Sequence, residues 1–157
     1  MISGGEAAGG NETITVRRMS PADVTDVLVI LHESPEAAMW TAESLMEAAS
    51  SGAAWIAEAN GQDVAFLIGR AVADEFEVLN LAVTPAQRRR GIALRLMNEA
   101  LRHARTSGAN RAYLEVRSSN KAAIALYSRF SFTEWGRRPG YYQYPVEDAL
   151  VLAFDLK

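Results

Sequence analysis

The stretch from Tyr113 to Tyr127 restricts the possible folds more than any other part of the chain. Apolar and polar residues alternate over Arg111–Arg117, which is the period of a β-strand with one buried face. Asn120 is a typical N-cap residue, and the apolar spacing after it predicts a helix over Lys121–Phe130. Since a strand that leads directly into a helix belongs to a βα unit, part of the sheet is expected to pair in parallel.

The other periodic segments add a hairpin-rich first half to this unit. Asn60-Gly61 separates two β-patterned segments and is a strong signal for a tight hairpin turn. The apolar run within Phe76–Val83 is typical of a central strand covered on both faces. The predicted strands are Ile14–Met19, Ala54–Ala59, Val64–Val72, Phe76–Val83, Arg111–Arg117, Phe132–Gly136 and Ala149–Leu156, and the predicted helices are Pro21–His32, Ala42–Ser50, Gly91–Thr106 and Lys121–Phe130.

This order of elements predicts one α/β (α+β) domain over residues 13–157, with a mixed sheet and helices on both of its faces. Residues 1–12 are rich in Gly and Ala, and we expect a disordered tail there. The chain has no Cys and only two His, which excludes disulfides and disfavours a metal site. It has no signal-peptide pattern, no apolar run of membrane length and a net charge of −3. We therefore expect a cytoplasmic protein that binds neither membrane nor nucleic acid.

An anion site is indicated where a buried strand leads into a helix. Arg88, Arg89 and Arg90 precede Gly91, and the helix that follows offers unpaired backbone N–H groups to an anion. Gly91 and the small Ala93 allow the backbone to approach that anion closely. The spacing agrees equally well with a solvated arginine loop before an amphipathic helix.

Two side chains of the strand–helix unit suit acid–base chemistry. Glu115 lies in mid-strand on the polar face, where a carboxylate needs either a partner or a function. It can form a salt bridge with Arg111 or Arg117, or it can take a proton from an amine as a general base. Tyr127 can be an ordinary core aromatic residue, or its phenol can give a proton to a departing thiolate.

Several of these motifs resemble a known family. Leu81-Ala82-Val83-Thr84-Pro85 followed by Arg88-x-x-Gly91-x-Ala93 resembles the acetyl-CoA signature of the GCN5-related N-acetyltransferases (GNAT superfamily). A longer pattern is similar to the RimI family, whose members acetylate the N-terminal alanine of a small-subunit ribosomal protein. That pattern runs from Leu114-Glu115-Val116-Arg117-x-Ser119-Asn120 to Tyr127 and continues with Arg137-Arg138, Tyr141-Tyr142 and Glu147-Asp148-Ala149-Leu150. The resemblance covers nearly the whole chain.

The resemblance implies a GNAT fold, a mixed and mostly antiparallel sheet of about seven strands that is splayed between its fourth and fifth strands. It implies acetyl-CoA as cosubstrate without a metal, Glu115 as general base and Tyr127 as general acid. The amide of Val83 would bind the oxyanion that forms on the thioester carbonyl. The implied cofactor-binding residues are Leu81, Ala82, Val83, Arg88, Arg89, Arg90, Gly91, Ile92, Ala93, Asn120, Ala123 and Tyr127, and the candidates for the acceptor site are Trp40, Arg137, Arg138, Tyr141 and Tyr142.

Two positions depart from the family pattern. Ser131 stands where relatives usually have Gly before Phe132, so the end of the preceding helix is expected to be strained or differently shaped. Arg88 stands where many relatives have Gln, a change that is compatible with phosphate binding. Tyr141 and Tyr142 are expected in a loop before the final strand, where they either shape the acceptor slot or belong to an ordinary surface loop.

The leading interpretation is direct acetyl transfer to a protein N-terminal α-amine, with a ribosomal protein as the acceptor. Direct transfer is favoured over an acyl-enzyme because the chain has no Cys. The alternatives are the same chemistry on another protein N-terminus, on a lysine or on a small-molecule amine. Retention of Glu115 and Tyr127 disfavours a nonenzymatic acyl-CoA-binding module, and the negative net charge disfavours nucleic-acid binding through Arg88–Arg90.

Overall fold

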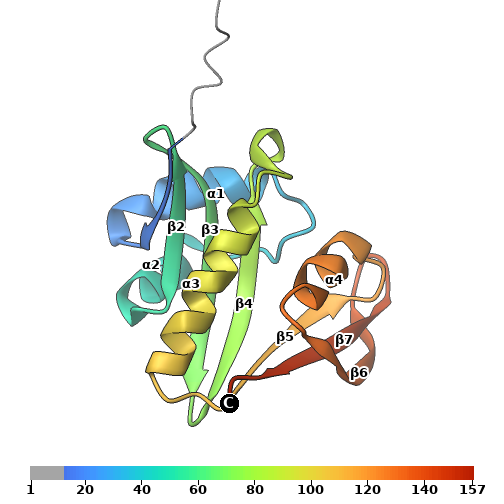
Figure 1. Cartoon of the computed structure of the whole chain (residues 1–157). Helices are drawn as coiled ribbons and strands as arrows, with labels where there is room; N and C mark the ends of the chain where they lie inside the picture. The colour runs from blue at the N-terminus through green and yellow to red at the C-terminus, as the bar shows by residue number, and fades with distance from the viewer. Residues whose placement is uncertain (1–12) are drawn as a thin grey trace, which may run out of the picture.

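The computed structural model describes residues 13–157 and contains a seven-stranded sheet with helices on both faces (Figure 1). The expected tail, residues 1–12, lies outside the described residues. The strands are β1 (Ile14–Arg18), β2 (Ala54–Ala59), β3 (Gln62–Val72), β4 (Glu75–Val83), β5 (Arg111–Arg117), β6 (Thr133–Tyr142) and β7 (Glu147–Asp155). The helices are α1 (Val24–His32), α2 (Ala42–Ser51), α3 (Ile92–Thr106) and α4 (Lys121–Ser128), with short 3₁₀ turns at Pro21–Asp23 and Pro85–Gln87.

The sheet is mixed and mostly antiparallel, as expected. Its spatial order is β1-β2-β3-β4-β5-β7-β6, and only β4 and β5 pair in parallel. Local signals account for several of the connections. Asn60 and Gly61 both have positive φ, 51° and 80°, and form the tight turn between β2 and β3. The side chain of Asn120 accepts the Ala123 N–H at 3.1 Å, so the predicted N-cap of α4 is confirmed.

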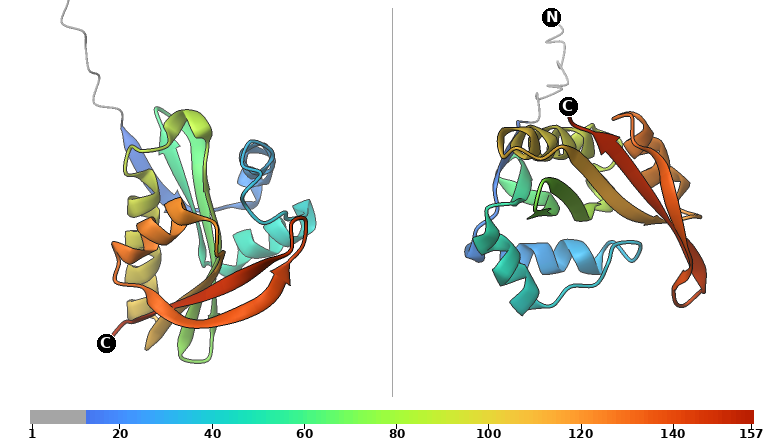
Figure 2. Two further views of the ribbon diagram at one scale, coloured as in Figure 1. Left: turned by 90° about the vertical axis from the view of Figure 1, so that its right-hand side faces the viewer. Right: turned by 90° about the horizontal axis from the view of Figure 1, so that it is seen from below.

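The apolar side chains form two clusters, one on each face of the sheet. Figure 2 shows α3 on one face and α1 and α2 on the other. Alternation along β2 serves both clusters, because Trp55 packs on the α3 side and Ile56 on the α1–α2 side. Burying one such side chain stabilises the fold by roughly 1.5–3 kcal/mol. Within residues 13–157, no helix is both long enough and apolar enough to cross a membrane.

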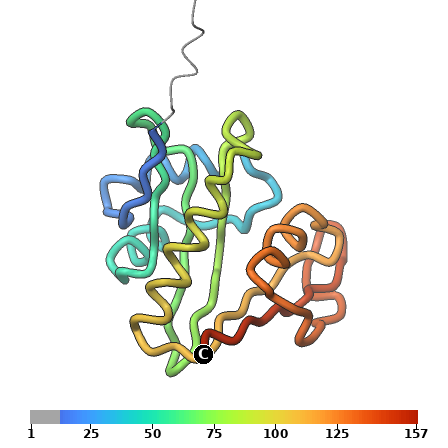
Figure 3. Tube along the Cα trace, viewed as in Figure 1, coloured from blue at the N-terminus to red at the C-terminus, as the bar shows by residue number. Residues whose placement is uncertain are grey.

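Strands β4 and β5 separate along the sheet. They pair only over Glu75–Val78 and Arg111–Leu114 and then diverge (Figures 1 and 3). The pairing of β3 with β4 is shifted beside Leu79, which marks a bulge where the separation begins. Beyond it Leu81 and Val83 are only half-buried, so the expectation that β4 is covered on both faces is wrong for this half. The reason is that the sheet opens beside it.

Strand β6 is longer than the sequence pattern predicts. It continues past Gly136 to Tyr142, so the expectation that Tyr141 and Tyr142 lie in a loop is wrong. Pro139-Gly140 resembles a turn in the sequence, but β6 is an edge strand, where a residue without an N–H donor is tolerated. The pairing of β6 with β7 is irregular between Arg138 and Tyr142, and this irregularity accommodates Pro139 and Gly140.

The end of α4 carries the strain expected from the serine at position 131. Ser131 has φ of 68°, in the left-handed region that favours glycine. The Phe132 N–H donates to the Tyr127 carbonyl at 3.2 Å, which closes the helix end in the manner of a Schellman motif. This turn brings the ring of Phe132 to 6.0 Å from that of Tyr127.

Candidate active site

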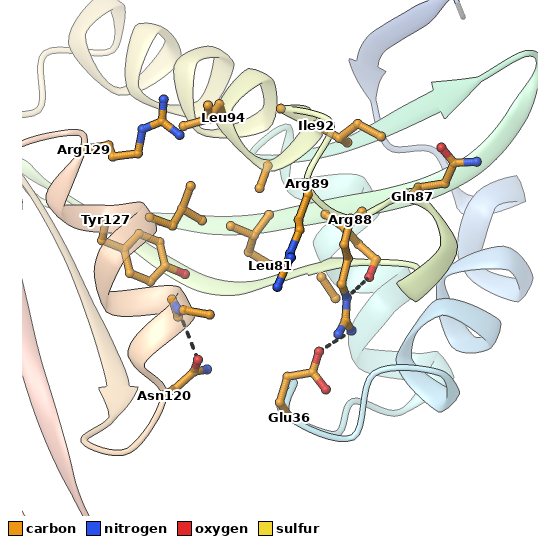
Figure 4. Close-up of a pocket in the computed structure, with 17 residues that line it drawn as sticks. Glu36, Leu81, Gln87, Arg88, Arg89, Ile92, Leu94, Asn120, Tyr127 and Arg129 are labelled. Atoms are coloured by element: carbon orange, nitrogen blue, oxygen red, sulfur yellow. Dashed lines mark hydrogen bonds and ion pairs between the residues drawn. The ribbon is translucent and has the colours of Figure 1, made fainter.

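A cleft of about 730 Å³ lies where β4 and β5 diverge (Figure 4). Its walls are the second half of β4, the loop before α3, the first turn of α3, helix α4 along its length and Glu36 of the α1–α2 segment. The residues that the resemblance assigns to the cofactor all line it, except Arg90. The cleft is also lined by residues that were not predicted, namely Glu36, Gln87, Leu94, Ala122, Leu126 and Arg129.

The start of α3 forms one end of this cleft. Gly91 occupies the N-cap position with φ of 76°, and a Cβ built there would meet no atom within 4 Å. Arg89 also has positive φ, 65°, and its side chain extends along the cleft (Figure 4). The unpaired N–H groups of the first turn of α3 therefore lie beside open space and a guanidinium group. This arrangement suits a pyrophosphate.

Arg88 also forms bonds to protein acceptors. Its Nε donates to the Val83 carbonyl at 3.0 Å, and its guanidinium pairs with Glu36 of the segment between α1 and α2 (Figure 4). The side chain thus links the end of β4 to the α1–α2 segment. It lines the cleft while its donors are directed at protein acceptors.

The divergence of the strands leaves backbone amides of β4 directed at the split. The Thr84 N–H donates to the Val64 carbonyl of β3 at 2.8 Å. Since successive amides of a strand point to opposite edges, the N–H groups of Leu81 and Val83 point to the split edge. That edge of β4 pairs with β5 only as far as Val78. These amides are therefore available as donors to a bound carbonyl oxygen.

Tyr127 combines the two roles considered for it. Its ring packs against Phe132 and is 8% exposed, so it belongs to the core. Its hydroxyl group nevertheless points into the cleft (Figure 4). Burial, with a smaller effect from Tyr142, raises the pKa of the Tyr127 phenol to about 12. The phenol is therefore protonated, and it is a donor, at any physiological pH.

Glu115 lies in a second, smaller pocket of about 310 Å³. Because α4 packs on Leu114 and Val116, the side chain of Glu115 points to the opposite face of the sheet. The second pocket therefore lies on the other face of the sheet from α4, over β5, β7 and β6. The second pocket is lined by Tyr113, Glu115, Trp135, Gly136, Arg137, Arg138 and Val151.

The salt bridge of Glu115 is made by a partner that was not predicted. Its Oε1 lies 2.7 Å from Nε of Arg138, so pairing with Arg111 or Arg117 is wrong. Arg138 belongs to β6, two strands away, with β7 between them. Gly136 lies directly across β7 from Glu115.

The remaining acceptor-site candidates do not form one cluster. Tyr141 and Tyr142 contact each other with ring centroids 5.1 Å apart, and Arg138 lies 5.5 Å from the Tyr141 ring. Trp40 packs against the cluster beneath α1 and α2. Trp40, Tyr141 and Tyr142 line neither of the two pockets.

Asn80 was missed by the sequence analysis. It is 7% exposed, and its Nδ2 donates to the Ala38 carbonyl at 2.9 Å, which attaches the α1–α2 segment to β4. The signal was present, because Asn80 is the one polar side chain in the apolar run from Val78 to Val83. Residues 13–157 contain no cluster of three or more His, Cys, Asp or Glu side chains suited to a metal ion.

The split sheet, the open cleft beside the start of α3 and the carboxylate on the other face together form the arrangement of an acyl-transfer enzyme. The chain belongs to the acetyltransferase (GNAT) family, whose model matches residues 23–132. The predicted fold and the assignment as an acetyltransferase are thereby confirmed.

Within this family, the chain is similar to several enzymes that are named as N-terminal acetyltransferases. The [ribosomal protein bS18]-alanine N-acetyltransferase of Escherichia coli (strain K12) is 37% identical over 99 residues, which are 62% of this chain and 67% of the relative. The N-alpha-acetyltransferase RimI of Mycobacterium tuberculosis is 41% identical over 88 residues, 56% of this chain and 54% of the relative. The crystal structure of the ribosomal-protein-S18-alanine N-acetyltransferase from Escherichia coli matches with a TM-score of 0.79 and 29% identity, covering 92% of this chain and 95% of that one.

Proposed function

We propose that this enzyme transfers the acetyl group of acetyl-CoA directly to a protein N-terminal α-amine. The acceptor we favour is the N-terminal alanine of a small-subunit ribosomal protein. The observation that carries the proposal is that Tyr127 lines the cleft where β4 and β5 diverge, while Glu115 lies on the opposite face of β5, just past its last pair with β4. The names of the relatives support the choice of acceptor.

In this mechanism Glu115 prepares the amine. An α-amine has a pKa of about 7.7–8.0, so a large share of it carries a proton near pH 7. Its positive charge takes the place of the Arg138 guanidinium on the carboxylate, so Glu115 keeps a cationic partner. Glu115 then accepts the proton, directly or through a water molecule. The freed guanidinium can donate to the first carbonyl of the acceptor.

The neutral amine attacks the thioester carbon, and a C–N bond forms as the carbonyl oxygen becomes negative. The Val83 N–H, on the open edge of β4, stabilises that charge. Glu115 passes the first proton on to solvent. When the C–S bond breaks, the carboxylate or a water molecule takes the remaining extra proton of the nitrogen, and the CoA thiolate leaves with the electron pair of that bond. The products are an N-terminal amide and free CoA, without a covalent enzyme intermediate.

Tyr127 supplies the proton for the thiolate. A phenol of pKa about 12 is a weak acid beside a thiol, whose ordinary pKa is about 8.5. However, the thiolate forms in the same cleft, where burial beneath the bound cosubstrate would make it more basic as well. A hydrogen bond from the phenol therefore stabilises the sulfur as charge develops, and proton transfer completes the departure.

The test is an acetyl-CoA assay across a set of peptides. The set contains free N-termini that differ in the first three residues, one peptide with a blocked α-amine and free lysines, and several small amines. We expect turnover with free α-amines behind a small first residue and none with the blocked peptide. Acetylation of the blocked peptide would assign the enzyme to lysine, and a preference for small amines would exclude a protein acceptor.

A further inference from the structure

We infer that Arg117 is a positioning residue that holds one wall of the acceptor site, the turn at the tip of the β6–β7 hairpin. This turn, Gln143–Val146, is called the hairpin turn below. The inference rests on the proposed function, since it assigns a role within the acceptor site. Tyr142, directly before this turn, lies close enough to both Glu115 and Tyr127 to interact with them electrostatically, so the turn borders the two proposed catalytic groups. Figure 2 shows the hairpin projecting beyond the sheet on the side that carries α1 and α2.

The contacts of Arg117 converge on this one turn. Its Nη1 donates to the Pro145 carbonyl and to Glu147 Oε1, each at 3.3 Å. Its Nη2 donates to the Gln143 carbonyl at 3.2 Å. The planar guanidinium also lies 4.4 Å from the centre of the Tyr142 ring. The oxygen atoms that accept these hydrogen bonds come from both sides of the turn, so the Arg117 side chain holds the two sides together.

Burial of apolar side chains does not hold the turn in place. Tyr144 is 97% exposed and Val146 is 70% exposed. A turn without buried side chains needs polar bonds to keep one position, because ordering its backbone is entropically unfavourable. The polar bonds come from Arg117, whose own side chain is 30% exposed and therefore largely shielded from water.

Arg117 and its partner Glu147 also contact residues next to the two proposed catalytic groups. Glu147 Oε2 accepts the Ser119 N–H at 3.0 Å, directly before the N-cap of the helix that carries Tyr127. These bonds hold the pKa of Glu147 below its ordinary value, so the carboxylate stays charged. Arg117 follows Glu115 by two residues on the same face of β5. One guanidinium thus joins the strand of the base, the start of the acid's helix and the acceptor wall.

The test compares Arg117→Met with the matched variant Arg111→Met. Arg111 lies on the same strand and face, and its guanidinium stacks 4.9 Å from Trp135 and pairs with Asp155, away from the hairpin turn. We expect Arg117→Met to raise the KM for the acceptor peptide about tenfold or more, a loss of binding of about 1.4 kcal/mol. The dissociation constant for acetyl-CoA is expected to stay unchanged. Arg111→Met should alter neither value.

Two further measurements separate positioning from general damage. Hydrogen exchange of the amides at 143–147, measured without any acceptor, should accelerate in Arg117→Met and not in Arg111→Met. Arg117→Lys keeps the charge but cannot serve all three acceptors, so it should recover only part of the lost affinity. Equal protection of the turn in both methionine variants would overturn the inference. So would an acceptor KM that is unchanged while exchange accelerates.

The outcomes distinguish this inference from the proposed function. If no N-terminal peptide is acetylated by the unmodified enzyme, the proposed function fails, and the KM comparison is repeated with whichever amine is accepted. The exchange measurement does not depend on the acceptor. An accelerated turn with an unchanged KM for that amine would restrict Arg117 to a structural role.

Discussion

The guanidinium Nε of Arg138 lies 2.7 Å from the carboxylate Oε1 of Glu115, across an intervening strand. The Arg138 side chain is 59% exposed and that of Glu115 is 17% exposed, so water solvates the arginine more than the glutamate. An ion pair with one exposed partner is typically worth about 0–1 kcal/mol. Arg138 can therefore leave Glu115 at small cost when a cationic amine arrives.

Variants of the two partners distinguish a catalytic role of Glu115 from a structural one. We expect Glu115→Gln to lower kcat by about 10²–10⁴-fold near pH 7, with a smaller loss at high pH, where the amine is already deprotonated. Arg138→Met should leave kcat within about threefold and change the stability by less than about 1 kcal/mol. If both variants lose kcat equally, Glu115 acts as the partner of Arg138 and not as the base.

Tyr127→Phe removes the proton donor and keeps the ring that packs on Phe132. Turnover should fall while Tm stays the same, and activity should recover on thioesters whose thiols are more acidic. Because the pKa of Tyr127 is raised to about 12, its phenol stays protonated throughout the assay range. The pH profile of the unmodified enzyme should therefore show no loss of activity from this group below pH 10. Full turnover by the Phe variant on acetyl-CoA would leave Tyr127 as a core residue only.

Gly91→Val tests the anion site at the start of α3. The substitution strains a residue with φ of 76° and fills the space that an anion would approach. Gly108→Val is the matched control, because Gly108 follows the other end of α3 with φ of 88° and an equally open Cβ position. Both variants should lose stability, but only Gly91→Val should lose CoA binding in a calorimetric titration. Unchanged CoA affinity in a folded Gly91→Val protein would place the pyrophosphate elsewhere.

Ser131→Gly should stabilise the protein. The φ of 68° at Ser131 is unfavourable for a residue with a Cβ, and glycine adopts it without that strain. We expect a gain of about 1 kcal/mol, which corresponds to about 2–4 °C in Tm for a chain of this size. The matched substitution Ser128→Gly lies within α4 and should be destabilising instead. A lower Tm for Ser131→Gly would show that its side chain contributes more than its backbone strain.

The acidic residues around Arg17 should give stability an unusual dependence on pH. Burial raises the pKa of Asp63 to about 6, although its Oδ1 lies 3.1 Å from Arg17. The native state therefore holds a proton on Asp63 that the unfolded chain has already released, and stability should fall as pH rises from about 4 to about 6. Hydrogen bonds from Arg17 lower the pKa of Asp23 to about 2, so its contribution is lost as pH falls from about 4 to about 2.

Thermal melts between pH 2 and pH 7 measure both effects. Asp63→Asn keeps the size of the side chain and removes the titration, so the decline of Tm between about pH 4 and pH 6 should disappear. The decline below about pH 4, which belongs to Asp23, should remain. A Tm that rises from pH 4 to pH 6 in the unmodified protein would contradict the raised pKa of Asp63.

Much of the fold followed from local patterns in the sequence. Within residues 13–157, all seven strands and four helices were predicted, because alternation and 3.6-residue periodicity depend only on neighbours along the chain. The turn at Asn60-Gly61 and the cap at Asn120 rest on side chains that act within three residues. Most residues that line the larger pocket lie in two short segments, each beside the start of a helix, which is why the sequence pattern could suggest them. The splayed sheet was expected only from the resemblance to a family.

Tertiary structure decided which side chains became partners. Alternation placed Glu115 on the polar face of β5, but its partner, Arg138, depends on the register of two further strands. The bonds from Asn80 to Ala38 and from Arg88 to Glu36 join segments more than 40 residues apart. A pattern in one segment states which face a side chain occupies and carries no record of what lies opposite. The sequence by itself therefore determined the elements and the chemistry they carry, while long-range packing decided how the two pockets are walled and which ion pairs form.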